Sequence, residues 1–159
     1  MEGSRGGAET RRPIDDVTGL IVDAAYRLHT GIGPGLLESV YEAVLARDLA
    51  RQGLQVERQR PVSFDYDGLH FQDAFRVDLF VEGRVAVEIK SVERFSPAHP
   101  KQLLTYLRLL ELPVGLLINF GAPTFKEGIR RIVNRLPVSA TPRLRVNQPV
   151  GQPVPDSPI

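Results

Sequence analysis

The chain has 159 residues, of which 42% are hydrophobic and 25% are charged, so its size and composition fit one globular domain with an apolar core. It contains no cysteine, which excludes disulfides, cysteine-ligated zinc, iron–sulfur clusters and a cysteine nucleophile. The formal net charge is only +1, so nucleic acid would have to be held by a local basic patch rather than by the field of the whole protein.

The composition changes along the chain and divides it into three segments. Residues 1–13 begin with a glycine-rich stretch and predict a flexible N-terminal arm. Residues 14–136 carry the apolar patterns of a single compact domain. Residues 137–159 hold six of the 13 prolines, and we expect an extended tail there, with a short strand near Leu144 or a partner-binding segment as alternatives.

No apolar run reaches the ~20 residues of a membrane-spanning helix. The amino terminus also lacks the apolar stretch of a signal peptide. We therefore expect a cytoplasmic protein without a membrane partner.

Two helices are expected at the start of the domain. Apolar residues recur at helical spacing as far as Leu28, and Asp15 or Asp16 is the expected N-cap. A stretch rich in glycine and proline ends this helix. A second helix is expected over residues 36–51, with Gly53 at its C-cap.

The hydrophobic period changes to two after the second helix, which predicts strands. The expected strands cover residues 54–66, 70–81 and 85–92. The dipeptides Asp67-Gly68 and Glu82-Gly83 separate them and are typical of hairpin turns.

The last part of the domain adds a helix and a buried strand. The helix begins at Ser96 and Pro97, and the apolar run at residues 114–119 suits a buried strand in parallel pairing. Residues 124–136 are compatible with either a helix or a turn followed by a strand. The order of elements predicts an α/β fold with a mixed sheet.

The register of the second hairpin follows from its apolar residues, which alternate on both strands. They are Val77, Leu79 and Val81 before the turn, and Val85, Val87 and Ile89 after it. A three-residue loop that pairs Val81 with Val85 brings both triplets to one core, whereas a two-residue loop would separate them. We therefore expect the three-residue loop.

This register places Asp78 opposite Glu88, on the face that also carries Lys90. Side chains directly opposite each other have Cβ atoms roughly 5 Å apart, and two carboxylates that close repel unless a cation lies between them. Mg²⁺ suits such oxygen ligands, with Mn²⁺ as a substitute. Two acids, a lysine and a divalent metal fit phosphodiester hydrolysis. The same pattern also fits an ordinary solvated strand, and in both cases we expect the charged face to be open.

These residues resemble the PD-(D/E)XK nuclease-like superfamily, because Asp78 and Glu88-x-Lys90 are followed by a helix with Gln102 and Tyr106. More narrowly, residues 35–41 resemble the motif that names the GxxExxY family. Further segments similar to that family are residues 33–42, 87–92, 102–106 and 115–120, and the similarity spans residues 14–136. One departure is that Val77, rather than proline, precedes Asp78.

The resemblance implies a restriction-endonuclease-like core, with a central mixed four-stranded sheet flanked by helices and a metal site at one sheet edge. The residues implied as catalytic are Asp78, Glu88, Lys90 and Glu38. The implied metal ligands are Asp78, Glu88 and the backbone carbonyl of Ile89. Lys90 would position the attacking water or stabilise the transition state, and the residues expected to line the site are Gln102, Tyr106 and Tyr41. Tyr41 also fits the core, and Glu42 is expected to be a solvated surface charge.

The function that fits best is a metal-dependent nuclease acting on DNA, or less readily on RNA. Basic residues that fit phosphate contacts are Lys126, Arg130 and Arg131, although a solvated face explains them equally well. The alternative is a non-catalytic module that binds nucleic acid or protein on the same fold. A second copy of the chain or another protein partner is left open.

Overall fold

The computed structural model describes residues 11–135 and 144–146, so the first ten residues and most of the expected tail lie outside the described residues. The helices are α1 (Ile14–Ile32), α2 (Glu38–Arg51), α3 (Ala98–Leu110) and the single turn α4 (Phe125–Gly128). The strands are β1 (Val56–Tyr66), β2 (Leu69–Val81), β3 (Val85–Lys90), β4 (Val114–Asn119), β5 (Ile129–Val133) and β6 (Leu144–Val146). No helix in this part of the chain is long and apolar enough to cross a membrane.

All six strands form one sheet in the order β5-β4-β3-β2-β1-β6. Only β3 and β4 pair in parallel, and the other neighbours are antiparallel, so the expected α/β fold with a mixed sheet is confirmed. The expectation of four strands is wrong, because β1 to β5 form a five-stranded sheet and the short β6 extends it. The fifth strand arises where the sequence was ambiguous: Thr124 caps one helical turn, and the chain then extends as β5.

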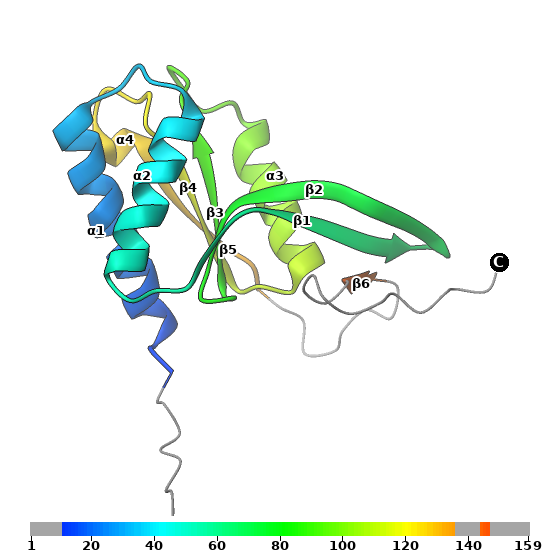
Figure 1. The fold of residues 1–159 in the computed structure, drawn as a ribbon. Coiled ribbons are helices and arrows are strands. Elements are labelled where there is room, and N and C mark those ends of the chain that lie inside the picture. Colours follow the sequence, from blue (N-terminus) through cyan, green and yellow to red (C-terminus); the bar gives the residue numbers. More distant parts are fainter. Residues whose placement is uncertain (1–10, 136–143, 147–159) are drawn as a thin grey trace, which may run out of the picture.

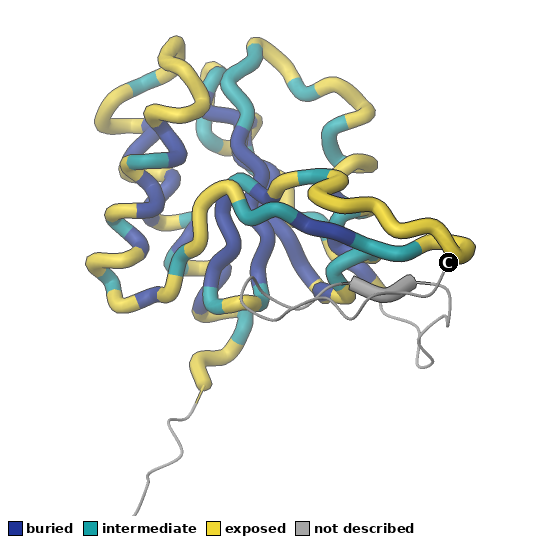
Figure 2. The backbone as a smooth tube through the Cα atoms, turned by 45° about the vertical axis from the view of Figure 1, so that its right-hand side comes forward, coloured by how far each residue is buried: buried dark blue, intermediate teal, exposed yellow. Residues whose placement is uncertain are grey.

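Helices cover both faces of the sheet (Figure 1). On one face α1 and α2 pack against the side chains of Leu79, Val87 and Ile118. On the other face α3 packs against Phe80, Ala86 and others. Figure 2 shows the consequence, since β3 and β4 are buried along their length, whereas the outer part of the β1–β2 hairpin is exposed.

The register of the β2–β3 hairpin is as the sequence predicts, with Val81 paired to Val85 and Leu79 to Val87. One expected detail is wrong. Val77 does not join Leu79 and Val81 on the α1–α2 face but packs with Phe80 on the α3 face. The regular alternation of β2 is therefore interrupted between Val77 and Leu79, where β2 stops pairing with β3. In Figure 1 the outer part of the β1–β2 hairpin projects beyond β3.

Helix ends differ slightly from the expected ones. Pro13, not Asp15 or Asp16, is the N-cap of α1, and the two acids lie in its first turn, where they interact favourably with the helix dipole. Residues 33–37 stay irregular, so α2 begins at Glu38. Its C-cap is Gln52, and Gly53 follows with a φ of 85°, a left-handed conformation that glycine adopts readily.

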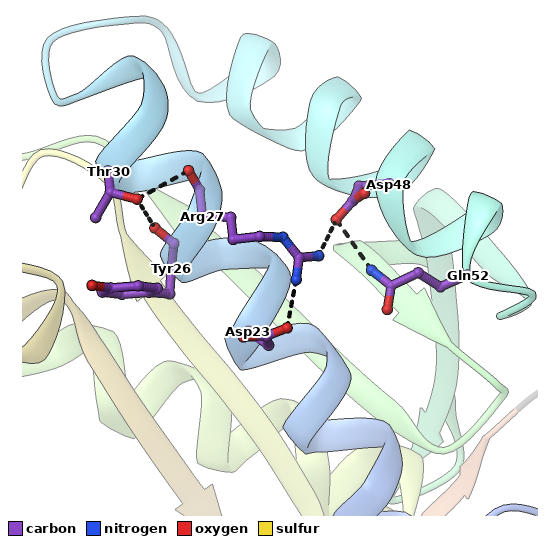
Figure 3. Close-up of polar contacts among 6 residues, drawn as sticks. All are labelled: Asp23, Tyr26, Arg27, Thr30, Asp48 and Gln52. Atoms are coloured by element: carbon purple, nitrogen blue, oxygen red, sulfur yellow. Dashed lines mark hydrogen bonds and ion pairs between the residues drawn. The ribbon is translucent and has the colours of Figure 1, made fainter.

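Polar contacts between α1 and α2 are centred on Arg27 and Asp48 (Figure 3). The Arg27 guanidinium donates to Asp48 at 3.0 Å and also to Asp23, while the Gln52 amide donates to Asp48 at 3.2 Å. These groups are substantially exposed, so they contribute little to stability. The position of α2, which carries Glu38, depends mainly on the buried apolar contacts of Leu45 and its neighbours.

Candidate active site

The site begins where the pairing of β2 with β3 stops. The last paired residues are Leu79 and Val87. Beyond them, two acidic side chains accept hydrogen bonds from the backbone of the facing strand. The backbone N–H of Asp78 donates to Oε1 of Glu88 at 3.3 Å, and the N–H of Ile89 donates to Oδ2 of Asp78 at 2.8 Å. Asp78 and Glu88 thus meet across the two strands, as the register predicts.

Glu88 is only 5% exposed. Burial, and then the nearby charge of Asp78, raise the pKa of Glu88 to about 8, while the hydrogen bond from the backbone N–H of Asp78 and the charge of Lys90 act in the opposite direction. A carboxyl group in this environment holds a proton at neutral pH unless a cation compensates its charge. Ionisation of Glu88 is therefore disfavoured unless a cation lies beside the pair.

The expectation that the charged face is an open platform is wrong. It fails because α3 packs over this face of the sheet. Tyr106 of α3 stacks on Phe75 with ring centroids 4.0 Å apart. Burial, followed by the charges of Glu88 and Asp78, raises the pKa of Tyr106, so its phenol is a hydrogen-bond donor at neutral pH.

Lys90 ends β3 and is partly exposed. Its charge reaches Glu88 and also His99, whose pKa is lowered by burial and by Lys90 against the opposing effect of Glu38. Glu38, the first residue of α2, accepts a hydrogen bond from the N–H of Ser91 at 3.3 Å. The structure therefore brings Glu38 to the same end of β3 as Lys90.

Two polar residues that sequence reasoning did not select as functional, Gln59 and Glu42, lie beside Asp78. The Gln59 amide nitrogen donates to Oε2 of Glu42 at 2.9 Å and to Oδ1 of Asp78 at 3.1 Å. Arg58 donates to the other oxygen of Glu42 at 3.3 Å. Glu42 is 6% exposed, so the expectation of a solvated charge is wrong: α2 docks with this residue against β1.

The sequence carries a signal for one of these two residues. Glu42 lies four positions after Glu38, on the same face of α2. Gln59 has no such pattern. Its φ of 51° is left-handed, a conformation that costs a non-glycine residue about 1–2 kcal/mol.

An acidic cavity of about 490 Å³ lies between α2 and the sheet. Three carboxylates face it, those of Glu38, Glu42 and Asp78. The remaining lining residues are Leu36, Leu37, Ser39, Gln59 and Ser91. This cavity gives solvent and small ions a route to Asp78.

Tyr41 and Gln102 occupy different environments. Tyr41 is fully buried and stacks on Phe120 at 4.4 Å. Its hydroxyl donates to the carbonyl of Gly33 at 2.6 Å and accepts from the N–H of Leu36 at 3.2 Å, so Tyr41 supports the loop that precedes Glu38. Gln102 is exposed on α3, one turn before Tyr106.

The basic residues expected to contact phosphate do not form one patch. Arg131 bonds to Asp15 of α1 at 2.8 Å, whereas Arg130 lies over the ring of Phe95, 5.5 Å from its centroid. The two arginines are adjacent in β5 and therefore lie on opposite faces. Lys126 is exposed on α4.

The donors that the acidic pair offers are oxygen atoms. Asp78 and Glu88 provide carboxylate oxygens, and the backbone carbonyl of Ile89 lies between Glu88 and Lys90 in sequence. No group of three Asp, Glu, His or Cys side chains in the described ranges can hold a metal ion. Carboxylate and carbonyl oxygens are the donors that hard divalent cations take in proteins.

A family model described as "PD-(D/E)XK nuclease superfamily" matches residues 15–132. No curated protein and no solved structure matches the chain. The matched region runs from α1 to β5 and includes every residue of the cluster around Asp78 and Glu88.

Proposed function

The chain belongs to the PD-(D/E)XK nuclease superfamily, and from this premise we propose that it is a divalent-metal-dependent nuclease that hydrolyses phosphodiester bonds in DNA, or less readily in RNA. The narrower proposal is that it is a GxxExxY protein. That proposal is supported by Gly35, Glu38 and Tyr41 at the spacing of the motif.

The observation that carries the proposal is the pairing of Asp78 with the buried Glu88. Burying Glu88 next to the carboxylate of Asp78 costs folding free energy when both groups are ionised. A protein that only binds nucleic acid has no use for this arrangement, because nucleic acid is itself negatively charged. A metal ion makes the arrangement favourable and relates it to the chemistry of the family.

Asp78, Glu88 and the carbonyl of Ile89 would hold Mg²⁺. When bound, the ion supplies Lewis acidity and lowers the pKa of a coordinated water. The Lys90 ammonium would bind a phosphate oxygen and stabilise the charge that develops there. Glu38 would orient the attacking water from the end of α2.

Residues of α3 would contact the substrate from the other side of the site. The pKa of Tyr106 is raised above its ordinary value of 10, so the phenol is protonated at neutral pH and would donate a hydrogen bond to phosphate. Gln102, one turn earlier and exposed, is placed to contact the sugar–phosphate backbone.

The test is cleavage of labelled single-stranded, duplex and branched DNA and of RNA by the purified full chain. Mg²⁺, Mn²⁺ and EDTA are compared, with Asp78→Asn and Lys90→Met beside wild type. Asp16→Asn, an exposed acid in the first turn of α1, is the matched control. We expect metal-dependent cleavage that falls about 100-fold or more in the two site variants and is unchanged in the control.

Two outcomes would contradict the nuclease. Cleavage that persists in Asp78→Asn would show that the activity resides elsewhere. Binding of labelled DNA without cleavage under any metal condition would favour the alternative, a non-catalytic binding module on the same fold.

A further inference from the structure

Gln59 has an unusual backbone for a residue in the middle of a strand. Its neighbours pair regularly, Arg58 with Leu79 and Arg60 with Val77, so the register places Gln59 across from Asp78. Yet its φ is 51°, where strand residues are extended. Strained non-glycine residues persist only where the surrounding structure demands them, and they concentrate at functional sites.

The side chain of Gln59 links two acids from different elements. Its amide nitrogen carries two hydrogens, and two acceptors lie within reach, Oε2 of Glu42 at 2.9 Å and Oδ1 of Asp78 at 3.1 Å. Both hydrogens are therefore used, and the amide has one orientation that serves both acceptors. The left-handed backbone places the amide between β2 and α2.

Glu42 is the fixed end of this chain of hydrogen bonds. It is 6% exposed and is also held by Arg58 at 3.3 Å. At the other end, the second oxygen of Asp78 accepts the N–H of Ile89 at 2.8 Å. Each Asp78 oxygen thus has one protein donor and keeps further acceptor capacity for a cation.

We propose that Gln59 is a positioning residue. Its amide connects the Asp78 carboxylate to the buried Glu42, which fixes the position of Asp78 without neutralising the charge of Asp78. The inference rests on the proposed function, since it assigns Gln59 to the metal site. The amide is a neutral donor, so it orients Asp78 and leaves the negative charge available for the metal. An ammonium or guanidinium group in the same place would also orient Asp78 but would compete with the metal.

Two substitutions separate positioning from a role in folding. Gln59→Gly removes the amide and suits the left-handed backbone. Gln59→Lys keeps a donor between Glu42 and Asp78 but adds a charge, so it supports folding through two ion pairs. Glu111→Gly is the matched control, because Glu111 is left-handed as well (φ 54°) and is exposed at the C-cap of α3.

Mn²⁺ affinity of the full chain is measured by isothermal titration calorimetry, with thermal unfolding in EDTA as a check of folding. We expect both Gln59 variants to bind Mn²⁺ about 10- to 100-fold more weakly than wild type. Gln59→Lys is expected to do so while unfolding at or above the wild-type temperature. Glu111→Gly should bind like wild type. Wild-type affinity in Gln59→Gly would overturn the proposal, and so would wild-type affinity in Gln59→Lys.

Hydrogen exchange of the Ile89 amide in the metal-free protein distinguishes this proposal from the proposed function. If Gln59 positions Asp78, the Ile89 amide should exchange at least about tenfold faster in Gln59→Gly, because its acceptor is released. If wild type binds no Mn²⁺ but this exchange increases, the nuclease proposal fails while the positioning of Asp78 stands. Unchanged exchange overturns the role of Gln59 whatever the metal result.

Discussion

The backbone N–H of Asp78 donates a hydrogen bond to the carboxylate of Glu88 at 3.3 Å. In the opposite direction, the backbone N–H of Ile89 donates to the carboxylate of Asp78. At this end of β3, hydrogen bonds to side-chain carboxylates thus replace the backbone hydrogen bonds between β2 and β3. This arrangement holds the partly exposed Asp78 against the buried Glu88, and it underlies the first two predictions.

Stability of the metal-free protein should depend on the ionisation of Glu88. The pKa of Glu88 is about 8 in the folded protein against an ordinary 4.5. The stabilising contribution is therefore complete below about pH 4.5 and is lost as the pH rises to about 8. In wild type we expect the free energy of unfolding to fall by up to ~1.4 kcal/mol per pH unit between about pH 5 and 8. In Glu88→Gln this fall should be absent. Urea unfolding in EDTA measures both proteins.

The comparison with Glu88→Gln isolates this effect from other titrating groups. His99 has a lowered pKa, and its contribution increases with pH in both proteins. Glu57→Gln, which changes an exposed acid of β1, serves as the control and should keep the wild-type slope. Equal slopes in wild type and Glu88→Gln would show that Glu88 is already ionised in the folded protein.

Metal binding should release a proton, because the ion binds the carboxylate form of Glu88. We expect Mn²⁺ affinity to increase about tenfold per pH unit between pH 6 and 8 and then to level off. Calorimetry at pH 7 in two buffers with different ionisation enthalpies should show close to one proton released per ion bound. Absence of buffer dependence would mean that Glu88 does not take part in binding.

Tyr41→Phe should destabilise the protein by about 1–2 kcal/mol, because the hydroxyl bonds to Gly33 and Leu36 are lost while the stacking on Phe120 is retained. Urea unfolding measures the change. Tyr26→Phe is the matched control, since Tyr26 is 52% exposed, and should lie within about 0.5 kcal/mol of wild type. Equal effects of the two substitutions would contradict the structural role of Tyr41.

Two glycine-to-alanine substitutions should have opposite effects. A Cβ on Gly121 would meet the backbone of Val92, 2.7 Å from its nitrogen, and we expect a loss of about 1–3 kcal/mol. Gly19 lies within α1 and has no atom within 4 Å of the added group, so Gly19→Ala should stabilise by about 0.5–1 kcal/mol. Thermal unfolding of both variants gives the comparison, and a stabilised Gly121→Ala would contradict the close approach to Val92.

Much of the site follows from alternation within one hairpin. The apolar residues around the turn determine which residue of β2 faces which residue of β3, so the pairing of Val81 with Val85, and with it the meeting of Asp78 and Glu88, is predictable from the sequence. The parallel strand at residues 114–119 is likewise predictable, because a continuous apolar run suits burial on both faces. The family model that assigns the chain to a nuclease superfamily matches residues 15–132, which include this hairpin.

The tertiary structure decided the parts of the site that depend on packing between distant elements. Burial of Glu42 requires α2 to dock against β1. The hydrogen bonds from Gln59 to Glu42 and Asp78 require the left-handed backbone at Gln59. The cover that α3 forms over Glu88 also results from long-range packing. Periodicity records which face of an element is apolar, but not which other element covers that face or where a strand departs from regular geometry. Those choices are made by contacts between segments far apart in the chain, so they became visible only in the folded structure.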